Sequence, residues 1–149
     1  NPVGPRQAAR AIIPTIILQA LKGGPIKLGS LQPTRDMNFV DNTVDGFVAA
    51  SSHPQVLGEI VNVGSGREIS VGDLARLIVR LVGTDSRVIE DEHRVRPEKS
   101  EVDRLLCNNE KAMRLMGWKP MIDLEDGLLR SIEWFRRHAN RFKAAIYNL

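Results

Sequence analysis

The chain has little cysteine and few aromatic residues, and each shortage excludes a class of protein. Its 149 residues include one cysteine, Cys107, so no internal disulfide can form, which predicts a reducing compartment such as the cytoplasm. No apolar run approaches the roughly 20 residues of a membrane-spanning helix, so we expect no membrane partner. Aromatic residues make up 5% of the chain, too few for the stacking surfaces of single-stranded nucleic-acid binders.

Charge of one sign is also scarce. The net charge is +3 and the basic residues are scattered, which argues against a nucleic-acid partner. The histidines His53, His93 and His138 lie far apart, and none stands at metal-ligand spacing with Cys107, so we expect no metal site. Cys107 follows two leucines, and we interpret it as a small buried hydrophobic residue.

What the chain does have is an alternation of helices with short strands, which predicts an α/β or α+β unit without a clean internal boundary. Glycine after an apolar helical stripe, and serine, asparagine or aspartate before one, set the expected helix ends. The expected helices begin near Pro14, after Ser70, after Asn108 or Asn109, and after Asp123. The expected strands cover residues 26–28, 37–40, 59–63, 87–89 and 105–107.

The strand-to-helix joint that follows Arg35 organises the rest of the chain. Asp41 is predicted to cap a helix that begins at the next residue. Val44, Phe47 and Val48 then recur at i, i+3 and i+4, which predicts one buried helical face. Arg35, held just outside this joint, offers a planar fork of donors suited to phosphate or carboxylate, although a structural ion pair is the alternative.

A glycine turn and several arginines are the remaining candidates for a site. Gly64-Ser65-Gly66 follows an expected strand, but Ile69 stands where the dinucleotide-binding pattern needs its third glycine, so we interpret a structural turn. Arg6, Arg35 and Arg96 each lie beside a proline or at a strand edge. If they converged, they would form a receptor for a phosphate ester. Exposed arginines are common, so the residues alone leave convergence open.

Six motifs occur in a characteristic order. They are Asn1-Pro2-Val3-Gly4-Pro5-Arg6, Ile12-Ile13-Pro14, Arg35-Asp36 with Phe39-Val40-Asp41, Asn62-Val63-Gly64-Ser65-Gly66, Arg96-Pro97, and Leu115-Met116-Gly117-Trp118-Lys119-Pro120. Together they resemble the C-terminal half of the extended short-chain dehydrogenases of the NAD-dependent epimerase/dehydratase family. The resemblance is closest to the nucleotide-sugar 4,6-dehydratases, although 4-epimerases share most of these motifs. It implies an α/β substrate-binding lobe over residues 1–149, with one strand-helix segment that would complete a missing Rossmann sheet.

The resemblance also implies roles for matching residues. Asn1 corresponds to an asparagine that contacts the sugar or diphosphate. Ile12 and Ile13 match a helix start that closes over the nucleotide, and Lys27 and Leu28 match a strand whose backbone lies against the base. A clamp on the diphosphate and ribose is implied for Arg35 and Arg96, which would turn remote binding energy into orientation of the sugar.

The chain differs from the family's usual pattern at some positions and lacks some of the family's motifs. Val3 stands where an aromatic residue is usual, and Asn42 replaces a commonly acidic residue. The family's glycine-rich NAD loop and its Tyr-x-x-x-Lys pair belong to an N-terminal half that is not in this chain, whose single tyrosine, Tyr147, has no lysine after it. The family oxidises the sugar at C4 by hydride transfer to NAD. The resemblance therefore implies that the full-length protein binds NAD, and that this fragment binds none, has no catalytic residues and is inactive alone.

The strand expected at residues 59–63 would join the large sheet of the missing half. In the isolated chain its edges would be unpaired, and such edges tend to pair with another chain. We therefore expect a homo-oligomer that is strand-exchanged or strand-paired. The leading hypothesis is the nucleotide-sugar-binding half of a dehydratase or epimerase, and the alternative is a stand-alone nucleotide-sugar-binding or regulatory module.

Overall fold

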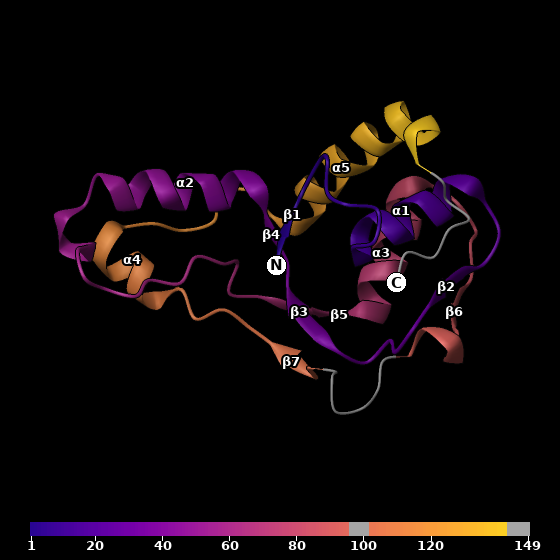
Figure 1. The fold of residues 1–149 in the computed structure, drawn as a ribbon, viewed down its shortest axis with the longest axis horizontal. Helices are drawn as coiled ribbons and strands as arrows, with labels where there is room; N and C mark the ends of the chain where they lie inside the picture. Colours follow the sequence, from indigo (N-terminus) through magenta and orange to yellow (C-terminus); the bar gives the residue numbers. More distant parts are fainter. Residues whose placement is uncertain (96–101, 143–149) are drawn as a thin grey trace.

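The structure, a computed structural model, describes residues 1–95 and 102–142 and shows helices joined by short strands (Figure 1). The helices are α1 (Ile12–Lys22), α2 (Val40–Ser51), α3 (Val71–Val82), α4 (Glu110–Met116) and α5 (Leu124–His138), with short 3₁₀ turns η1 (Pro54–Val56), η2 (Glu92–Arg94) and η4 (Ala139–Arg141). The strands are β1 (Pro2–Val3), β2 (Ile26–Leu28), β3 (Thr34–Asp36), β4 (Asn38–Phe39), β5 (Glu68–Ser70), β6 (Val88–Glu90) and β7 (Arg104–Leu105).

Three small sheets connect distant parts of the chain. β1 pairs in parallel with β4, and β2 pairs in parallel with β6. β3 lies between β5, to which it is antiparallel, and β7, to which it is parallel. Because each partner comes from a remote segment, the sheets place β1 beside β4, β2 beside β6, and β3 between β5 and β7.

The main core lies where α1, α3 and α5 pack together at one end of the molecule (Figure 1). Ile13, Ile17, Leu74, Ile78 and Phe135 are fully buried there. A second, smaller core forms beneath α2, at the opposite end in Figure 1, around α4 and Trp118. The packing of α1 against α3 and α5 thus fixes the position of the α1 N-terminal end and of the loop between β2 and β3.

Local capping signals were read correctly for α3, α4 and α5. The Ser70 hydroxyl accepts the Asp73 amide at 3.0 Å, and the Asp123 carboxylate accepts the Asp126 amide at 2.8 Å. Gly83 and Gly117 end α3 and α4 with φ of 80° and 61°, the left-handed region that favours glycine. These signals work because capping involves residues only a few positions apart.

The strand predicted at residues 37–40 is confirmed in its centre, where β4 (Asn38–Phe39) pairs with β1. It is one residue shorter at each end, and α2 already begins at Val40 with Phe39 as its N-cap residue and no side-chain cap. The prediction that Asp41 caps the helix is therefore wrong, since Asp41 lies in the first turn. The reason is tertiary: β4 is held by β1, with the Asn38 amide donating to the Asn1 carbonyl at 3.1 Å, so the chain turns into the helix as soon as that pairing ends.

The buried face of α2 is also not the predicted one. Val44, Phe47 and Val48 are 54%, 74% and 60% exposed, whereas the buried residues of α2 are Asn42 and Gly46. Asn42 donates to the Ile122 carbonyl at 2.7 Å and accepts the amides of Met121 and Ile122, both at 3.0 Å. Within the described residues, α2 thus packs inward through a polar and a small side chain, leaving its apolar stripe, here called the outer face of α2 (Val44, Phe47, Val48), uncovered.

The strand predicted at Glu59–Val63 is absent from the described structure. Extended backbone is stabilised as a strand only when a neighbouring strand supplies hydrogen bonds, and the described residues place no partner beside it. Ile60 is 85% exposed. Val63 instead packs on α2 beside Gly46. A Cβ atom added to Gly46 would lie 2.6 Å from the Val63 Cγ1 atom, so position 46 requires glycine for this close approach.

Candidate functional site

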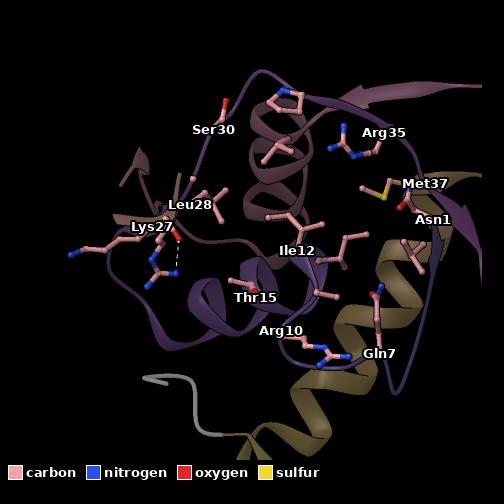
Figure 2. Close-up of a pocket in the computed structure, with 17 residues that line it drawn as sticks. Asn1, Gln7, Arg10, Ile12, Thr15, Lys27, Leu28, Ser30, Arg35 and Met37 are labelled. Carbon is pink, nitrogen blue, oxygen red and sulfur yellow. Dashed lines mark hydrogen bonds between the residues drawn. The ribbon is translucent and has the colours of Figure 1, made fainter. Parts of the chain in front are cut away.

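A cavity of about 330 Å³ lies between the start of α1, strand β2 and strand β3 (Figure 2). Among its lining residues are six of the seven predicted substrate-binding residues: Asn1, Ile12, Ile13, Lys27, Leu28 and Arg35. The seventh, Arg96, lies outside the described residues. Four separate segments of the chain therefore meet at one cavity, which spacing along the sequence could not establish.

The N-terminal end of α1 opens onto this cavity, and its first amides have no acceptor among the described residues. The N-cap residue, Ala11, provides no capping side chain, and the first turn contains no acidic residue. The Thr15 amide makes the first helical bond, to the Ala11 carbonyl at 3.0 Å. In residues 1–95 and 102–142 no acceptor is seen for the amides of Ile12 and Ile13. A helix start with free amides and a positive dipole end favours an anion.

Three arginine side chains reinforce this preference. Arg10, Arg35 and Arg94 line the cavity, and the described lining residues include no aspartate or glutamate. The Arg35 Nη1 donates to the Thr34 carbonyl at 2.8 Å, which holds the guanidinium beside β3. Figure 2 shows the Lys27 side chain extending away from the other labelled residues, so Lys27 contributes main chain rather than charge. The cavity is suited to a ligand with several negative charges.

Of the three arginines whose convergence the sequence left open, Arg35 lines the cavity and Arg96 lies outside the described residues. Arg6 is exposed and does not line the cavity, so it does not converge with Arg35 there. Its backbone has a φ of 66° in the chain reversal before α1, and Arg10, four residues later, reaches the cavity instead. Arg94, which belongs to the η2 turn, was not among the predicted site residues. The sequence signal for it was its position two residues before Arg96.

The edge of β2 that faces away from β6 is already hydrogen-bonded. The Lys27 amide donates to Gln19 Oε1 at 2.9 Å, and Gln19 Nε2 donates to the Lys27 carbonyl at 3.2 Å. The same carbonyl accepts Arg94 Nη1 at 3.1 Å. The Gln19 amide thus takes the place of a neighbouring strand, and Lys27 offers no unpaired main-chain group in this arrangement.

The residues Gly64-Ser65-Gly66 form a turn that has a structural role, as predicted from the sequence. A buried carboxylate holds this turn in place. Asp36, which is 3% exposed, accepts the Ser65 amide at 3.0 Å, the Ser65 hydroxyl at 2.7 Å and the Gly66 amide at 2.8 Å. The Cys107 amide donates to it at 3.3 Å. Because Asp36 occupies the amides that a pyrophosphate would need, these residues do not fit the phosphates of NAD.

The cavity has the groups for binding but not for proton transfer. The described lining includes no histidine, cysteine or carboxylate, and the Thr15 hydroxyl is engaged by the Ala9 carbonyl at 3.0 Å. Cys107 is half-buried beside Asp36, outside the cavity. Burial raises the pKa of its thiol, and the Asp36 charge raises that pKa further, which makes it a poor nucleophile.

The described part of the chain offers neither a cluster of metal ligands nor a membrane-spanning helix. No three histidine, cysteine, aspartate or glutamate side chains gather there closely enough to hold a metal ion. No helix there has both the length and the apolar composition needed to cross a membrane.

The chain is similar to proteins that act on activated sugars. Residues 1–130 match the family model described as GDP-mannose 4,6 dehydratase. UDP-glucose 4-epimerase of Mycolicibacterium smegmatis is 34% identical over 141 residues, which cover 91% of this chain and 43% of that protein. The chain spans less than half of the length of this relative.

Solved structures share the fold. An epimerase from Methanothermobacter thermautotrophicus superposes with a TM-score of 0.84 at 30% identity, over 95% of this chain and 42% of that one. The enzyme WbmF of Bordetella bronchiseptica, solved in complex with NADH, gives a TM-score of 0.75 at 29% identity, over 95% and 45%. These similarities confirm the predicted α/β lobe and the resemblance read from the six motifs. The chain belongs to the extended short-chain dehydrogenase family of NAD-dependent epimerases and dehydratases.

Proposed function

We propose that this chain is the nucleotide-sugar-binding half of an NAD-dependent sugar-nucleotide dehydratase or epimerase, a lyase or an isomerase as a complete protein. One observation carries the proposal: the uncapped start of α1 and three arginines meet at a cavity whose described lining has no acidic side chain. A diphosphate ester matches this combination, because it presents charge to both the helix amides and the planar guanidinium groups.

Each part of the cavity has a role in this proposal. The amides of Ile12 and Ile13 bind the diphosphate, and Arg35 neutralises it from β3. Asn1, whose Nδ2 donates to the Asp36 carbonyl at 3.3 Å, lies on the same side as Arg35 in Figure 2 and contacts the sugar side. Arg96 completes the clamp in the proposal. Binding energy from the unreactive diphosphate is thereby used to orient the sugar.

The catalytic groups and NAD belong, in this proposal, to a further half of the protein that is N-terminal to residues 1–149. NAD supplies hydride transfer there, and this chain binds the substrate without catalysing a reaction or holding NAD alone. The occupied Gly64–Gly66 turn and the absence of a proton-transfer group in the described cavity lining support this division. We place the protein in the cytoplasm, with no nucleic-acid or membrane partner.

The exposed apolar side chains on the outer face of α2, together with Ile60, favour a half-enzyme over a stand-alone binding module. Phe47, at 74% exposure, and Ile60, at 85%, are large apolar side chains left in solvent, and such residues mark a surface that another polypeptide covers. We propose that the other half covers it in the complete protein, and that the isolated chain forms homo-oligomers through it. Light scattering over a hundredfold concentration range is expected to show self-association, and a monomer throughout would contradict this.

Calorimetric titration of the chain with UDP-glucose, dTDP-glucose, GDP-mannose and glucose 1-phosphate tests the binding function. We expect the nucleotide sugars to bind, and Arg35→Ala to weaken them by about 10- to 100-fold, since a charge-assisted hydrogen bond contributes about 1.5–3 kcal/mol. Arg76→Ala is the matched control, because Arg76 pairs with Asp73 on the surface and is 64% exposed. Equal affinities for Arg35→Ala and the wild type, or no binding of any nucleotide sugar, would reject the proposal.

A turnover assay separates the half-enzyme from a complete enzyme. With NAD and each nucleotide sugar, we expect no increase in absorbance at the wavelength of NADH. Formation of NADH by the chain alone would show that it holds both the cofactor and a catalytic base, contrary to the proposal.

A further inference from the structure

The turn that leads into α1 holds the backbone of Arg10 at the edge of the cavity. The Ala11 amide donates to the Ala8 carbonyl at 2.9 Å, which closes a turn that contains Arg10. The Thr15 hydroxyl donates to the Ala9 carbonyl at 3.0 Å, which ties this turn to the beginning of the helix. The main chain of Arg10 is therefore fixed relative to the α1 amides, although its side chain is exposed.

The Arg10 side chain lines the cavity without a partner in the part of the chain that the structure describes. No hydrogen bond, ion pair or ring contact joins it to the rest of residues 1–95 and 102–142. By contrast, Arg76, Arg80 and Arg104 each lie beside a carboxylate, at 2.7, 3.1 and 2.8 Å. The described lining of the cavity contains no aspartate or glutamate. The Arg10 guanidinium is thus available to an anionic group of a ligand.

Arg10 lies toward the end of the cavity that is formed by the N-terminal strand. Gln7 Nε2 donates to the Pro2 carbonyl at 3.2 Å, which joins the loop before α1 to the residue that follows Asn1. Figure 2 shows Gln7 and Arg10 toward one end of the cavity and Ser30 toward the other. Because Asn1 contacts the sugar side in the proposed function, Arg10 stands on the sugar side of the helix start.

Building on the proposed function, we propose that Arg10 binds the sugar-side phosphate of the nucleotide sugar, while the Ile12 and Ile13 amides bind the nucleoside-side phosphate. The two phosphates share a bridging oxygen, so the second phosphate must lie next to the one at the helix start. Arg10 is two residues before Ile12, and its guanidinium presents paired donors that match phosphate oxygens. Arg10 is therefore a specificity-determining residue, which makes the chain select nucleoside diphosphates over monophosphates.

Titration calorimetry with UMP, UDP and UDP-glucose tests this assignment. We expect the wild type to bind UDP and UDP-glucose more tightly than UMP. Arg10→Ala should weaken both diphosphates by about tenfold, the loss of one charge-assisted hydrogen bond. It should weaken UMP by less than about threefold, because UMP loses only a screened charge. Arg10→Lys keeps the charge without the planar fork, and it should weaken the diphosphates less than Arg10→Ala does. Arg76→Ala removes an exposed arginine outside the cavity and should leave all three affinities unchanged.

The contrary outcomes are distinct. An equal loss for UMP and UDP in Arg10→Ala would show that Arg10 does not distinguish the two phosphates, and it would overturn the assignment. Unchanged affinities for UDP and UDP-glucose would also overturn it, while a loss in Arg35→Ala would still support the proposed function. If Arg10→Ala weakens UDP-glucuronate but not UDP-glucose, the partner of Arg10 is a sugar carboxylate and the assignment is wrong. A wild-type chain that binds none of these nucleotides would reject both the assignment and the proposed function. If Arg10→Ala unfolds, as judged by circular dichroism, the comparison of UDP with UMP in Arg10→Lys decides.

Discussion

Replacing Asp36 with asparagine removes a buried carboxylate that ties three segments together. Asp36 accepts the amides of Ser65, Gly66 and Cys107 as well as the Ser65 hydroxyl. An asparagine keeps one acceptor oxygen, but its NH₂ group must then face main-chain N–H groups on the other side. Two charge-assisted bonds are lost or become repulsive. Each contributes about 1.5–3 kcal/mol, so we expect the loss of two to lower the free energy of unfolding by about 3–6 kcal/mol in Asp36→Asn.

Urea denaturation followed by tryptophan fluorescence measures this change, since Trp118 is 4% exposed and reports on the core next to the turn. Asp85→Asn is the control, because Asp85 is exposed and surface substitutions usually change stability by less than about 0.5 kcal/mol. If Asp36→Asn also falls within about 0.5 kcal/mol of the wild type, the carboxylate does not hold the turn, and the reasoning is refuted.

We expect Asp36→Asn to weaken ligand binding at the cavity as well, because Asp36 is adjacent to Arg35. Arg35 and Asp36 are adjacent in β3, so their side chains point to opposite faces, one toward the cavity and one toward the turn. Loosening Asp36 lets β3 shift and mispositions Arg35. We expect weaker nucleotide-sugar binding in Asp36→Asn at temperatures where it is still folded, and calorimetry under those conditions checks it.

Three further predictions concern other buried or paired groups. Asn42→Asp keeps the oxygen that accepts the Met121 and Ile122 amides, but it replaces the donating NH₂ group with a second oxygen that faces the Ile122 carbonyl, the acceptor at 2.7 Å. It should lower the free energy of unfolding in urea by about 1–3 kcal/mol, and an unchanged midpoint would contradict this. Burial and the Asp36 charge raise the pKa of Cys107, so its alkylation by iodoacetamide should need a higher pH in the folded chain than in the unfolded chain. The folded chain favours the neutral thiol, and this contribution to the free energy of unfolding should be lost as pH rises through the folded-state pKa. Identical pH profiles for alkylation of the folded and unfolded chain would count against this prediction. Hydrogen bonds from Arg104, and to a lesser extent Thr34, lower the pKa of Glu68. The Arg104–Glu68 ion pair should therefore persist as pH falls below the usual glutamate range, and it should be lost when the pH falls through the lowered pKa of Glu68. An NMR titration of the Glu68 carboxyl group measures that pKa, and an ordinary glutamate value would disprove the prediction.

The elements that the sequence predicted well are those decided by neighbours in the chain. Ser70 and Asp123 cap α3 and α5 through bonds that span three residues, and Gly83 and Gly117 supply left-handed backbone where the helices end. Residue type and spacing are sufficient for such features, because the interacting groups are held close by the chain itself.

Two wrong predictions and one question that the sequence left open share a different cause. The apolar stripe of α2 was predicted to be buried, but Asn42 and Gly46 face the rest of the described chain. The strand at 59–63 lacks a neighbour there, and Arg10 rather than Arg6 reaches the cavity. Each depends on which remote segment lies alongside, and periodicity shows only that a face is apolar, not what covers it.

The sequence by itself determined the ends of α3 and α5 and the motif order that identifies the family, because these depend on residue type and local spacing. The resemblance carried by that motif order also named six residues that line the cavity, but their meeting there was decided by the tertiary structure. Only the tertiary structure decided that Arg94 and Arg10 join Arg35, that Gln19 closes the edge of β2, and that Asp36 occupies the glycine turn. These contacts join residues up to 71 positions apart, and their geometry is set by the packing of α1, α3 and α5 and by strand pairing, which no local pattern encodes.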